Sequence, residues 1–395
     1  MGWAKEQAIR QMEQGWSPIG NKQVCANCFE DYAIKQFIEQ NVAANRCSYC
    51  RRRGRKQIAA EIDDVIEFIA AGISTEYEDP VHSVGWDSAE GGWLLPTMDA
   101  RDLLSEAGLE ETQEDLLEDL RQAFSQSEWV QKDPYGDLLC DALRYNWHAF
   151  AEQVKHRTRF VFFRIETAEK MSWETEPHHI LTSLEEITKE LELVRIVPRE
   201  TSFFRGRCHE AAEELGDAKA LGAPPQELAS HSRTSPAGIA MLHVAADANT
   251  AQAETVFVNP AHGHMTVAEF HNLRELRILD LSIIPEVPSL FDEQKRHQRM
   301  PLIFLRHFAN EISKPISDNV KAYEYVPTQV MTEYFRHLFR SGMNQSLDGL
   351  AFASSKRAGG VCYTLFFDQA ACANEASEDG AVMLFKRATR HSRPK

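Results

Sequence analysis

Long apolar stretches are missing from this sequence. None of its 395 residues fall in a run of about 18 uncharged apolar residues, which excludes a predicted membrane-spanning helix. Basic residues are also in the minority: 43 Lys and Arg against 59 Asp and Glu give a formal net charge of −16. Such a charge argues against a protein coated for nonspecific nucleic-acid binding. The first residues lack the apolar core of a secretory signal, and we expect a cytoplasmic protein.

The sequence changes character along its length, and no internal repeat is found. A chain of this size is expected to form two or three domains. We distinguish residues 1–75, with clustered cysteines and a helix, residues 76–195, which are mostly helical, and residues 196–395, where short strands alternate with helices. This alternation predicts an α/β or α+β core. Our overall prediction is an α+β protein with an N-terminal cysteine module.

Apolar periodicity and turn residues predict the individual elements. Helices are predicted over 58–71 with Gly72 as the stop, and over 98–104, 114–124, 138–150, 181–193, 301–313 and 328–341. Strands are predicted over 241–245, 255–258, 275–281, 350–354, 362–367 and 382–385. The basic tail, residues 386–395, is predicted to be loose.

Four cysteines form two pairs near the N-terminus. Cys25 and Cys28 make one C-x-x-C pair, and Cys47 and Cys50 make a second. Two such pairs present four thiolates at the corners of a tetrahedron, which suits Zn²⁺ and leaves no open coordination position. We therefore predict a structural zinc ion, with a redox pair or incidental thiols as the alternative. The remaining cysteines are predicted to be buried apolar residues: Cys140, Cys208, Cys362 and Cys372.

A basic run, Arg51–Lys56, directly follows the last of these cysteines. It has two interpretations. It could track a phosphate backbone, as basic patches do in nucleic-acid-binding proteins. It could equally form a solvated face whose positive charge offsets that of nearby thiolates. We favour the solvated face.

The C-terminal half contains several short motifs in a fixed order. Arg233 lies ten positions before His243, and Glu254 lies eleven positions after it. This spacing, across a turn, a short strand and the start of a helix, is expected to bring a cation and an anion to one cleft. The motifs are Phe203-Phe-Arg-Gly-Arg207, Leu221-Gly-Ala-Pro-Pro225, Ser232-Arg-Thr-Ser-Pro-Ala-Gly-Ile239, Thr250-Ala-Gln-Ala-Glu254, Tyr325-Val-Pro-Thr-Gln329 and Gly349-Leu-Ala-Phe-Ala-Ser-Ser355.

In their joint order these motifs resemble the RES domain, and the N-terminal half is similar to the zinc-containing region that precedes some RES domains and is named for HEPN and RES proteins. The resemblance implies degradation of NAD⁺ by cleavage of its nicotinamide–ribose bond, with phosphate or water as the acceptor. Certain relatives instead transfer ADP-ribose to a protein. The fold implied is like that of ADP-ribosyltransferases, a split mixed sheet with a cleft between its parts.

The residue types suit this chemistry. Arg205 and Arg233 are the candidates to bind the pyrophosphate, because guanidinium matches phosphate geometry. Glu254 would stabilise the oxocarbenium-like ribose as nicotinamide departs. Ser354 would hydrogen-bond the ribose or the amide, with Ser355 as the fallback. For each residue alone, a surface charge or, for Glu254, an interaction with a helix start is the simpler interpretation.

Two positions depart from the family pattern. His243 stands where relatives usually carry Tyr, and Ser232 stands where they carry Gly. The imidazole of His243 can still stack on the nicotinamide ring and donate a hydrogen bond. Because histidine titrates near neutrality, we hypothesise that its protonation repels the cationic ring and that activity falls in mild acid. The same departure would fit a copy with weakened catalysis.

Two other functions stay open at this stage: a nucleic-acid-binding zinc protein with a degenerate RES scaffold, and a protein ADP-ribosyltransferase. An RNase role for Arg144 and His148 is rejected, because three residues separate them where HEPN ribonucleases have four to six. Loss of NAD⁺ would poison a cell, so control by an antitoxin, a trigger protein or the N-terminal half is expected. The sequence is compatible with an oligomer.

Overall fold

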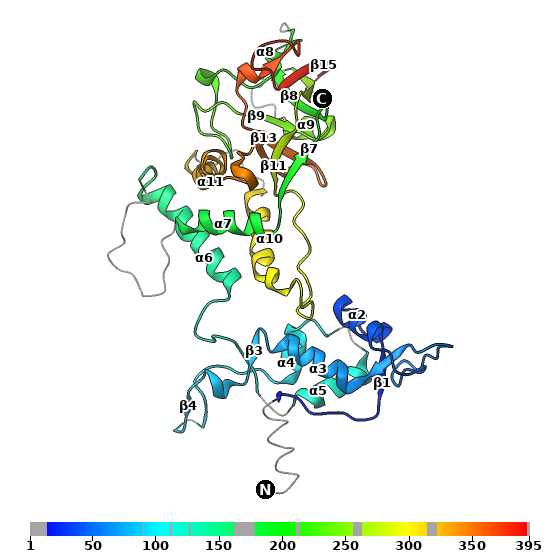
Figure 1. The fold of residues 1–395 in the computed structure, drawn as a ribbon. Helices are drawn as coiled ribbons and strands as arrows, with labels where there is room; N and C mark the ends of the chain where they lie inside the picture. The colour runs from blue at the N-terminus through cyan, green and yellow to red at the C-terminus, as the bar shows by residue number, and fades with distance from the viewer. Residues whose placement is uncertain are drawn as a thin grey trace. The chain divides into compact units, whose positions relative to one another are not determined.

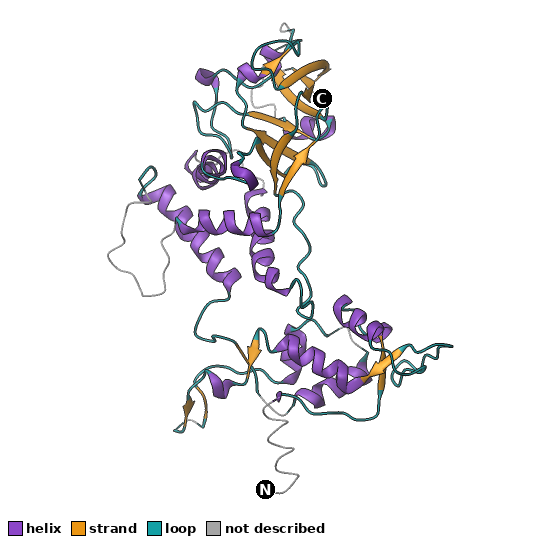
Figure 2. Cartoon of the chain, viewed as in Figure 1, coloured by secondary structure: helices purple, strands orange, loops and turns teal. Residues whose placement is uncertain are grey.

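The computed structural model describes residues 14–89, 91–110, 113–125, 128–161, 178–210, 214–255, 263–313 and 322–392. The chain divides into two compact units (Figures 1 and 2). Unit 1 comprises Met1–Leu138 and Glu286–Met300, and unit 2 comprises Leu139–Pro285 and Pro301–Lys395. The three regions that we distinguished in the sequence have boundaries at 75 and 195, which differ from those of the two units. The division into three domains stays a prediction.

In its described residues, unit 1 consists mainly of helices with three pairs of very short strands. Its helices are α2 (Tyr32–Gln40), α3 (Ile62–Ile73), α4 (Ala100–Glu106) and α5 (Glu114–Phe124). Its strands are β1 (Gln23–Cys25), β2 (Ala59–Glu61), β3 (Tyr77–Glu78), β4 (Trp86–Asp87), β5 (Gly92–Trp93) and β6 (Val130–Gln131). The strands pair antiparallel as β1–β2, β3–β6 and β4–β5.

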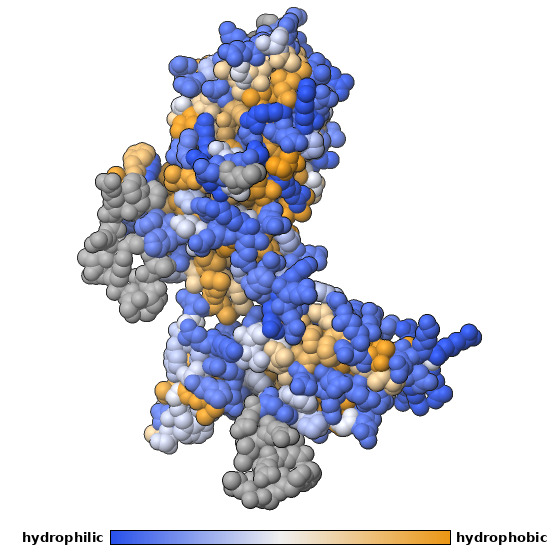
Figure 3. All heavy atoms as spheres, viewed as in Figure 1, coloured by the Kyte–Doolittle hydropathy of each residue, from blue (hydrophilic) through white to orange (hydrophobic). Residues whose placement is uncertain are grey.

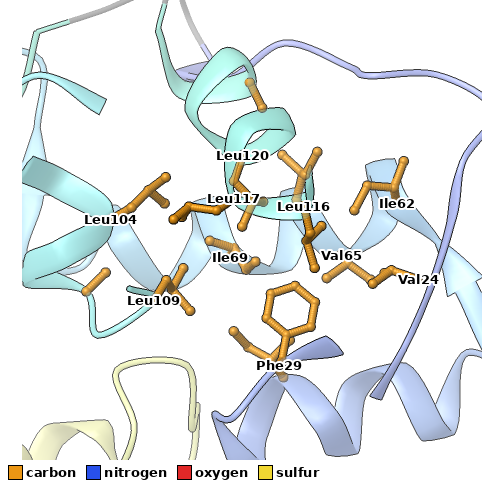
Figure 4. Packing of buried hydrophobic residues seen from close by; sticks show 14 of the residues in the cluster. Val24, Phe29, Ile62, Val65, Ile69, Leu104, Leu109, Leu116, Leu117 and Leu120 are labelled. Atoms are coloured by element: carbon orange, nitrogen blue, oxygen red, sulfur yellow. The ribbon is translucent and has the colours of Figure 1, made fainter. Parts of the chain in front are cut away.

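The core of unit 1 forms where the apolar faces of these helices meet (Figure 4). Ile62, Val65 and Ile69 line one face of α3 and are fully buried. Leu116 and Leu120 of α5 pack in the same cluster. Burying such side chains stabilises the fold by roughly 1.5–3 kcal/mol each.

A segment distant in sequence completes this core. Leu290 and Phe291, from Glu286–Met300, are buried in the same cluster as α3. Gly72 makes this packing feasible, since a Cβ atom at position 72 would lie 2.5 Å from Cδ1 of Phe291. Gly72 was predicted to stop the helix, but α3 continues to Ile73. Its role is therefore close packing and not helix termination.

Unit 2 is built on a mixed sheet with helices. Its helices are α6 (Leu139–Glu152), α7 (His179–Glu190), α8 (Ala218–Leu221), α9 (Ala248–Glu254), α10 (Arg299–Ser313, whose first two residues belong to unit 1) and α11 (Val326–His337). Its strands are β7 (Val194–Val197), β8 (Ser202–His209), β9 (Leu242–Ala245), β10 (His264–Asn272), β11 (Leu276–Asp280), β12 (Gly349–Ala353), β13 (Val361–Leu365), β14 (Cys372–Ala373) and β15 (Met383–Ser392).

The described strands form a nine-stranded sheet in the order β14-β15-β10-β8-β9-β13-β12-β11-β7. Two pairs, β11–β12 and β14–β15, are parallel, and the others are antiparallel. Within the described residues, β8 and β9 share a single registered pair, Phe204 and Ala245. The two halves of the sheet therefore separate at β8 and β9, which opens space between them. This confirms the predicted α+β class, with a mixed sheet in the C-terminal half.

Two predictions about local structure were wrong. The helix predicted from 58 begins at Ile62, because residues 59–61 pair with β1 as strand β2. The tail predicted to be loose forms most of β15, which pairs with β10 as far as Ser392. Repeated pairing along β10 fixes this basic segment despite its polar composition. Most of the strand predicted over 255–258 lies outside the described residues.

None of the helices in the described residues combines the length and the apolar character that a membrane crossing requires. Figure 3 shows mostly hydrophilic residues on the viewed face of each unit, with smaller apolar areas interspersed.

Candidate functional site

The separation of the sheet halves contains a cavity of about 370 Å³. This volume falls within the range of small-molecule sites, roughly 300–1,000 Å³. Its walls come from β8, β9, β12, β13 and α9 of unit 2 and from the loop before β9. The described residues that line it are Phe204, Arg205, Gly206, Ser232, His243, Val244, Ala245, Ala251, Glu254, Thr255, Phe352, Cys362 and Tyr363.

The glycine of the Phe-Phe-Arg-Gly-Arg motif lets α9 approach β8. A Cβ atom at Gly206 would lie 2.0 Å from Oγ1 of Thr255 and 3.1 Å from the carbonyl oxygen of Ala251. Any side chain here would therefore push α9 away from the strand. Because Arg205 precedes this glycine and Glu254 ends α9, the close approach brings their side chains to the same cavity.

Glu254 is the last residue of α9 and not near its start, as the sequence had suggested. The negative end of the helix dipole lies there, so an anion gains no stabilisation from the helix. Its carboxylate is held instead by Ser354, whose hydroxyl donates to Oε1. The same hydroxyl oxygen accepts hydrogen bonds from the backbone N–H groups of Lys356 at 3.2 Å and Arg357 at 3.0 Å. Ser354 therefore orients the carboxylate.

Arg205 presents an incompletely satisfied cation to the cavity. Its Nη1 donates to the carbonyl of His243 at 3.0 Å. Its Nε is buried and has no hydrogen-bond partner within the described part of the chain. Burial lowers the pKa of Arg205 to about 10, with a further contribution from Arg207, so the group is still charged at neutral pH. A buried, under-paired guanidinium favours an anionic ligand.

Arg233 lies on a loop that α11 holds in place. Thr328 Oγ1 donates to the carbonyl of Arg233 at 2.6 Å, and Gln329 Nε2 donates to the carbonyl of Ser232 at 2.7 Å. The motif Tyr325-Val-Pro-Thr-Gln329 thus positions the motif that carries Arg233. Its Nη1 donates to the carbonyl of Ile312 at the end of α10.

The carboxylate of Glu254 is close enough to Arg233 to influence the pKa of that guanidinium. Burial lowers the pKa of Arg233, and Tyr325, Glu254 and Cys362 oppose this shift electrostatically. Ser232, beside it in the chain, is among the residues that line the cavity, whereas Arg233 is not. Glu254 therefore lies in the cavity wall, and Arg233 lies near Glu254 without lining the cavity in the described residues.

His243 is surrounded by hydroxyl groups. Its Nδ1 is 3.2 Å from Thr364 Oγ1, and its Nε2 is 3.2 Å from Ser235 Oγ and 3.5 Å from Ser232 Oγ. Burial, together with the charge of Arg205, lowers the pKa of His243 to about 4. The imidazole is therefore neutral in mild acid. This shift argues against protonation of His243 in mild acid, and the hypothesis that protonation reduces activity there stays a prediction.

Two residues near Glu254 were missed from the sequence. Cys362 is buried, as predicted, but its thiol lies beside Glu254, and burial followed by the charge of that carboxylate raises its pKa to about 12. Arg357 Nη1 donates to Asp247 Oδ2 at 3.0 Å and to Thr250 Oγ1 at 2.9 Å, which anchors the start of α9. Arg357 could have been considered from the sequence, because it lies three residues after Ser354, a predicted site residue. Nothing in the local sequence of Cys362 distinguishes it.

The four predicted metal ligands come together in unit 1. Cys25 ends β1, and the distances between sulfur atoms are 3.8 Å for Cys25–Cys28, 3.4 Å for Cys25–Cys50 and 3.6 Å for Cys28–Cys47. Four thiolates around Zn²⁺ at about 2.3 Å would be separated by about 3.8 Å. All eight cysteines are free thiols, and three of these four are buried while Cys50 is exposed. The donor set fits a tetrahedral zinc ion.

The surroundings act differently on the individual thiols of this cluster. Burial raises the pKa of Cys25 to about 11 and raises that of Cys28 as well. Burial acts in the same direction on Cys47, but backbone N–H groups of Cys50, Cys25 and Tyr49 outweigh it and lower its pKa to about 7. Such N–H donors stabilise thiolate sulfur, the form that binds metal.

The basic run beside this cluster is exposed. Arg51, Arg52, Arg53, Arg55 and Lys56 all point to solvent, and Arg51 adopts a positive φ of 58° at the turn after Cys50. Exposure agrees with the solvated face that we favoured and leaves the nucleic-acid alternative untested.

Comparison with known families assigns both halves of the chain. Residues 40–168 match the family described as HEPN/RES N-terminal domain 1, and residues 205–385 match the RES domain. No curated protein and no solved structure matches the chain. The compact units cut across these matches, because Glu286–Met300 lies in the RES match but packs in unit 1. The chain therefore carries a HEPN/RES N-terminal domain 1 followed by a RES domain.

Proposed function

We propose that this protein degrades NAD⁺ by breaking its nicotinamide–ribose bond, with phosphate or water as the acceptor. RES domains are a family of toxin NAD-degrading enzymes, and the matched region contains all five residues singled out for this chemistry, Arg205, Arg233, His243, Glu254 and Ser354. The observation that carries the proposal is the carboxylate of Glu254, oriented by Ser354 and lying in one cavity with the under-paired guanidinium of Arg205.

Arg205 supplies the binding of the pyrophosphate. Phosphate oxygens would pair with its Nε and so satisfy a buried donor that lacks a partner in the described residues. Arg233, held by α11, adds a second positive charge beside the cavity. With the pyrophosphate bound by these arginines, the carboxylate of Glu254 is available to the nicotinamide ribose.

Glu254 stabilises the transition state. As nicotinamide departs, positive charge develops on the ribose, and a fixed carboxylate favours that charge without reorganising. Ser354 acts as the positioning residue, since its hydroxyl already donates to Glu254 and is itself held by backbone N–H groups. This differs from the direct contact with ribose or amide that the sequence suggested.

The neighbouring titratable groups stay neutral during this step. With a pKa near 4, His243 is an uncharged imidazole at neutral pH, so it can stack on the cationic nicotinamide ring without repelling it. With a pKa near 12, Cys362 is a thiol and not a thiolate, which argues against a covalent cysteine intermediate. The carboxylate is then the anion available to the ribose.

The Cys₄ cluster is proposed to hold a structural zinc ion. Its four thiolates leave no open position for substrate, so the ion would stabilise unit 1 and take no part in NAD⁺ cleavage. Control by an antitoxin or a trigger protein remains part of this proposal, as does an oligomer.

The test is to incubate the full chain with NAD⁺, with and without inorganic phosphate, and to identify the products. Phosphorolysis gives ADP-ribose 1″-phosphate only when phosphate is present, and hydrolysis gives ADP-ribose in both reactions. ADP-ribose attached to protein would instead identify a transferase. Loss of a preorganised charged group commonly costs about 10²–10³ in rate, so Glu254→Gln should lower kcat by about this factor.

The matched control is Glu227→Gln, which neutralises an exposed carboxylate of the same unit. It should leave kcat unchanged. Nicotinamide release by Glu254→Gln at the rate of the unaltered chain would refute the role of this carboxylate. Salt-dependent RNA or DNA binding that is lost on neutralising Arg51–Arg53, without any NAD⁺ cleavage, would favour the nucleic-acid-binding alternative.

A further inference from the structure

Three metal-binding side chains meet in unit 2 outside the cavity. His148 comes from α6, and His307 and Glu311 come from α10. One ligand atom of each lies within 4.8 Å of the others. His307 and Glu311 are four residues apart, a spacing that places both on one face of a helix. Figure 1 shows α6 and α10 side by side.

The helices that carry these ligands are fixed by the residues next to them. Trp147 of α6 packs edge-on against Phe308 of α10, with ring centroids 4.8 Å apart, and both rings are buried. Phe150, one turn along α6, is fully buried and contacts Trp147 at 5.7 Å. The buried aromatic contact between α6 and α10 therefore fixes the two helices that carry the three donor side chains. None of the donors lies on a loop.

The carboxylate of Glu311 lacks a complete set of partners. Its Oε2 is buried and makes no hydrogen bond within the described ranges. Its Oε1 is 3.9 Å from Nδ1 of His148, too far for a hydrogen bond. An ion pair between these side chains would leave Oε2 unsatisfied, whereas a metal ion would bind the carboxylate directly.

We propose that His148, His307 and Glu311 bind a divalent transition-metal ion such as Zn²⁺. Two imidazole nitrogens and a carboxylate oxygen suit such ions, whereas Mg²⁺ and Ca²⁺ take oxygen ligands. With bonds of about 2.0–2.2 Å, tetrahedral ligands are separated by about 3.4 Å. The 3.9 Å between Nδ1 of His148 and Oε1 of Glu311, and the 4.8 Å limit for the whole set, exceed this value, so binding would require side-chain rotations. Water completes the coordination on the exposed side.

The helix that carries His307 and Glu311, α10, also provides a hydrogen-bond acceptor for Arg233. Ile312 directly follows Glu311, and its carbonyl accepts the hydrogen bond from Nη1 of Arg233. A metal ion bound to Glu311 fixes the last turn of α10 and, with it, this acceptor. If the proposed function holds, on which this step rests, metal binding improves the placement of Arg233 and lowers KM for NAD⁺ while leaving kcat unchanged.

Metal counting tests the site without any assay of activity. The full chain is titrated with Zn²⁺, and bound metal is measured by mass spectrometry of the metal and by calorimetry. The unaltered chain should take up one ion more than its cysteine cluster holds. His148→Ala and Glu311→Gln should each weaken that additional binding by at least about tenfold. His337→Ala, which removes an exposed histidine of α11, should leave it unchanged.

Melting curves by circular dichroism show that the variants fold, which is expected because His148 is 54% exposed. The proposed metal site would be refuted if only the cysteine cluster takes up metal. It would also be refuted if His148→Ala and the unaltered chain bind the additional ion equally well. Metal binding with no change in KM would overturn the coupling to Arg233. A chain that binds the additional ion but leaves NAD⁺ intact would instead contradict the proposed function.

Discussion

The cysteine cluster of unit 1 and the cavity of unit 2 differ in how completely their polar groups are satisfied. In the cluster, sulfur atoms lie 3.4–3.8 Å apart and backbone N–H groups point at Cys47. A single metal ion would complete it. In the cavity, Arg205 keeps a buried Nε without a partner in the described residues, and His243 is held neutral by burial.

This difference separates a site built for stability from a site built for a ligand. A fold gains nothing from a buried donor without a partner, which costs roughly 1–3 kcal/mol. Such a group is retained where a substrate supplies the partner. The cluster should therefore respond to changes through stability, and the cavity through NAD⁺ binding and turnover. Three predictions test this division, in order of decreasing effect.

Removal of metal from the cysteine cluster should have the largest effect. Structural zinc contributes about 10–16 kcal/mol in isolated zinc-finger peptides, although the helical core of unit 1 will retain part of its stability without it. Cys28→Ser or a strong chelator should release the metal and lower the melting temperature of unit 1. Cys208→Ser, a change on β8 outside the cluster, should leave the metal in place. Full metal content in Cys28→Ser would show that the cluster does not bind it.

Gly206→Ala should have an intermediate effect on the cavity. The added methyl group would lie against Thr255 and the backbone of Ala251, and overpacking of this kind costs roughly 1–3 kcal/mol. Movement of α9 displaces Glu254, so kcat should fall even under conditions where the melting temperature shows that the variant is folded. Gly263→Ala provides the control, because no heavy atom of the described residues lies within 4 Å of a Cβ atom there. Equal kcat for the two variants would argue against the packing of α9 on β8.

Acid should have the smallest effect on catalysis. Because the pKa of His243 is lowered to about 4, the rate of NAD⁺ cleavage should not depend on this residue between pH 5.5 and 8. Stability behaves differently. Between about pH 6.5, the pKa of an unfolded histidine, and pH 4, His243 is protonated in the unfolded chain but neutral in the folded protein. The free energy of unfolding therefore falls as the pH falls through this range.

His243→Phe removes this proton uptake while retaining a ring that can stack. Its rate should show the same pH profile as the unaltered chain, and its stability should depend less on pH over that lower range. A rate that falls in mild acid only when His243 is present would mean that the histidine is protonated in the folded protein.

The sequence predicted the cluster more completely than the cavity. The C-x-x-C spacing is local, so Cys25, Cys28, Cys47 and Cys50 could be assigned without knowledge of the fold. The cavity combines segments that start at 203, 232, 250 and 349, and only the joint order of the motifs indicated that they meet. Motif order does not specify contacts, which explains why the donor role of Ser354 towards Glu254 was not foreseen.

Tertiary packing accounts for the other differences. Gly72 was expected to end a helix, but its role depends on Phe291, more than two hundred residues away. The basic tail was expected to be loose because its composition is polar, yet it pairs along β10. The pKa of His243 depends on burial and on Arg205, and neither is visible from the residue type.

The most direct test is a crystal structure of Glu254→Gln with NAD⁺ bound. Our account predicts NAD⁺ in the cavity between β8 and β9, with a pyrophosphate oxygen hydrogen-bonded to Nε of Arg205 and the nicotinamide ribose beside position 254. NAD⁺ bound elsewhere on the protein, or a pyrophosphate that does not contact Arg205, would contradict it.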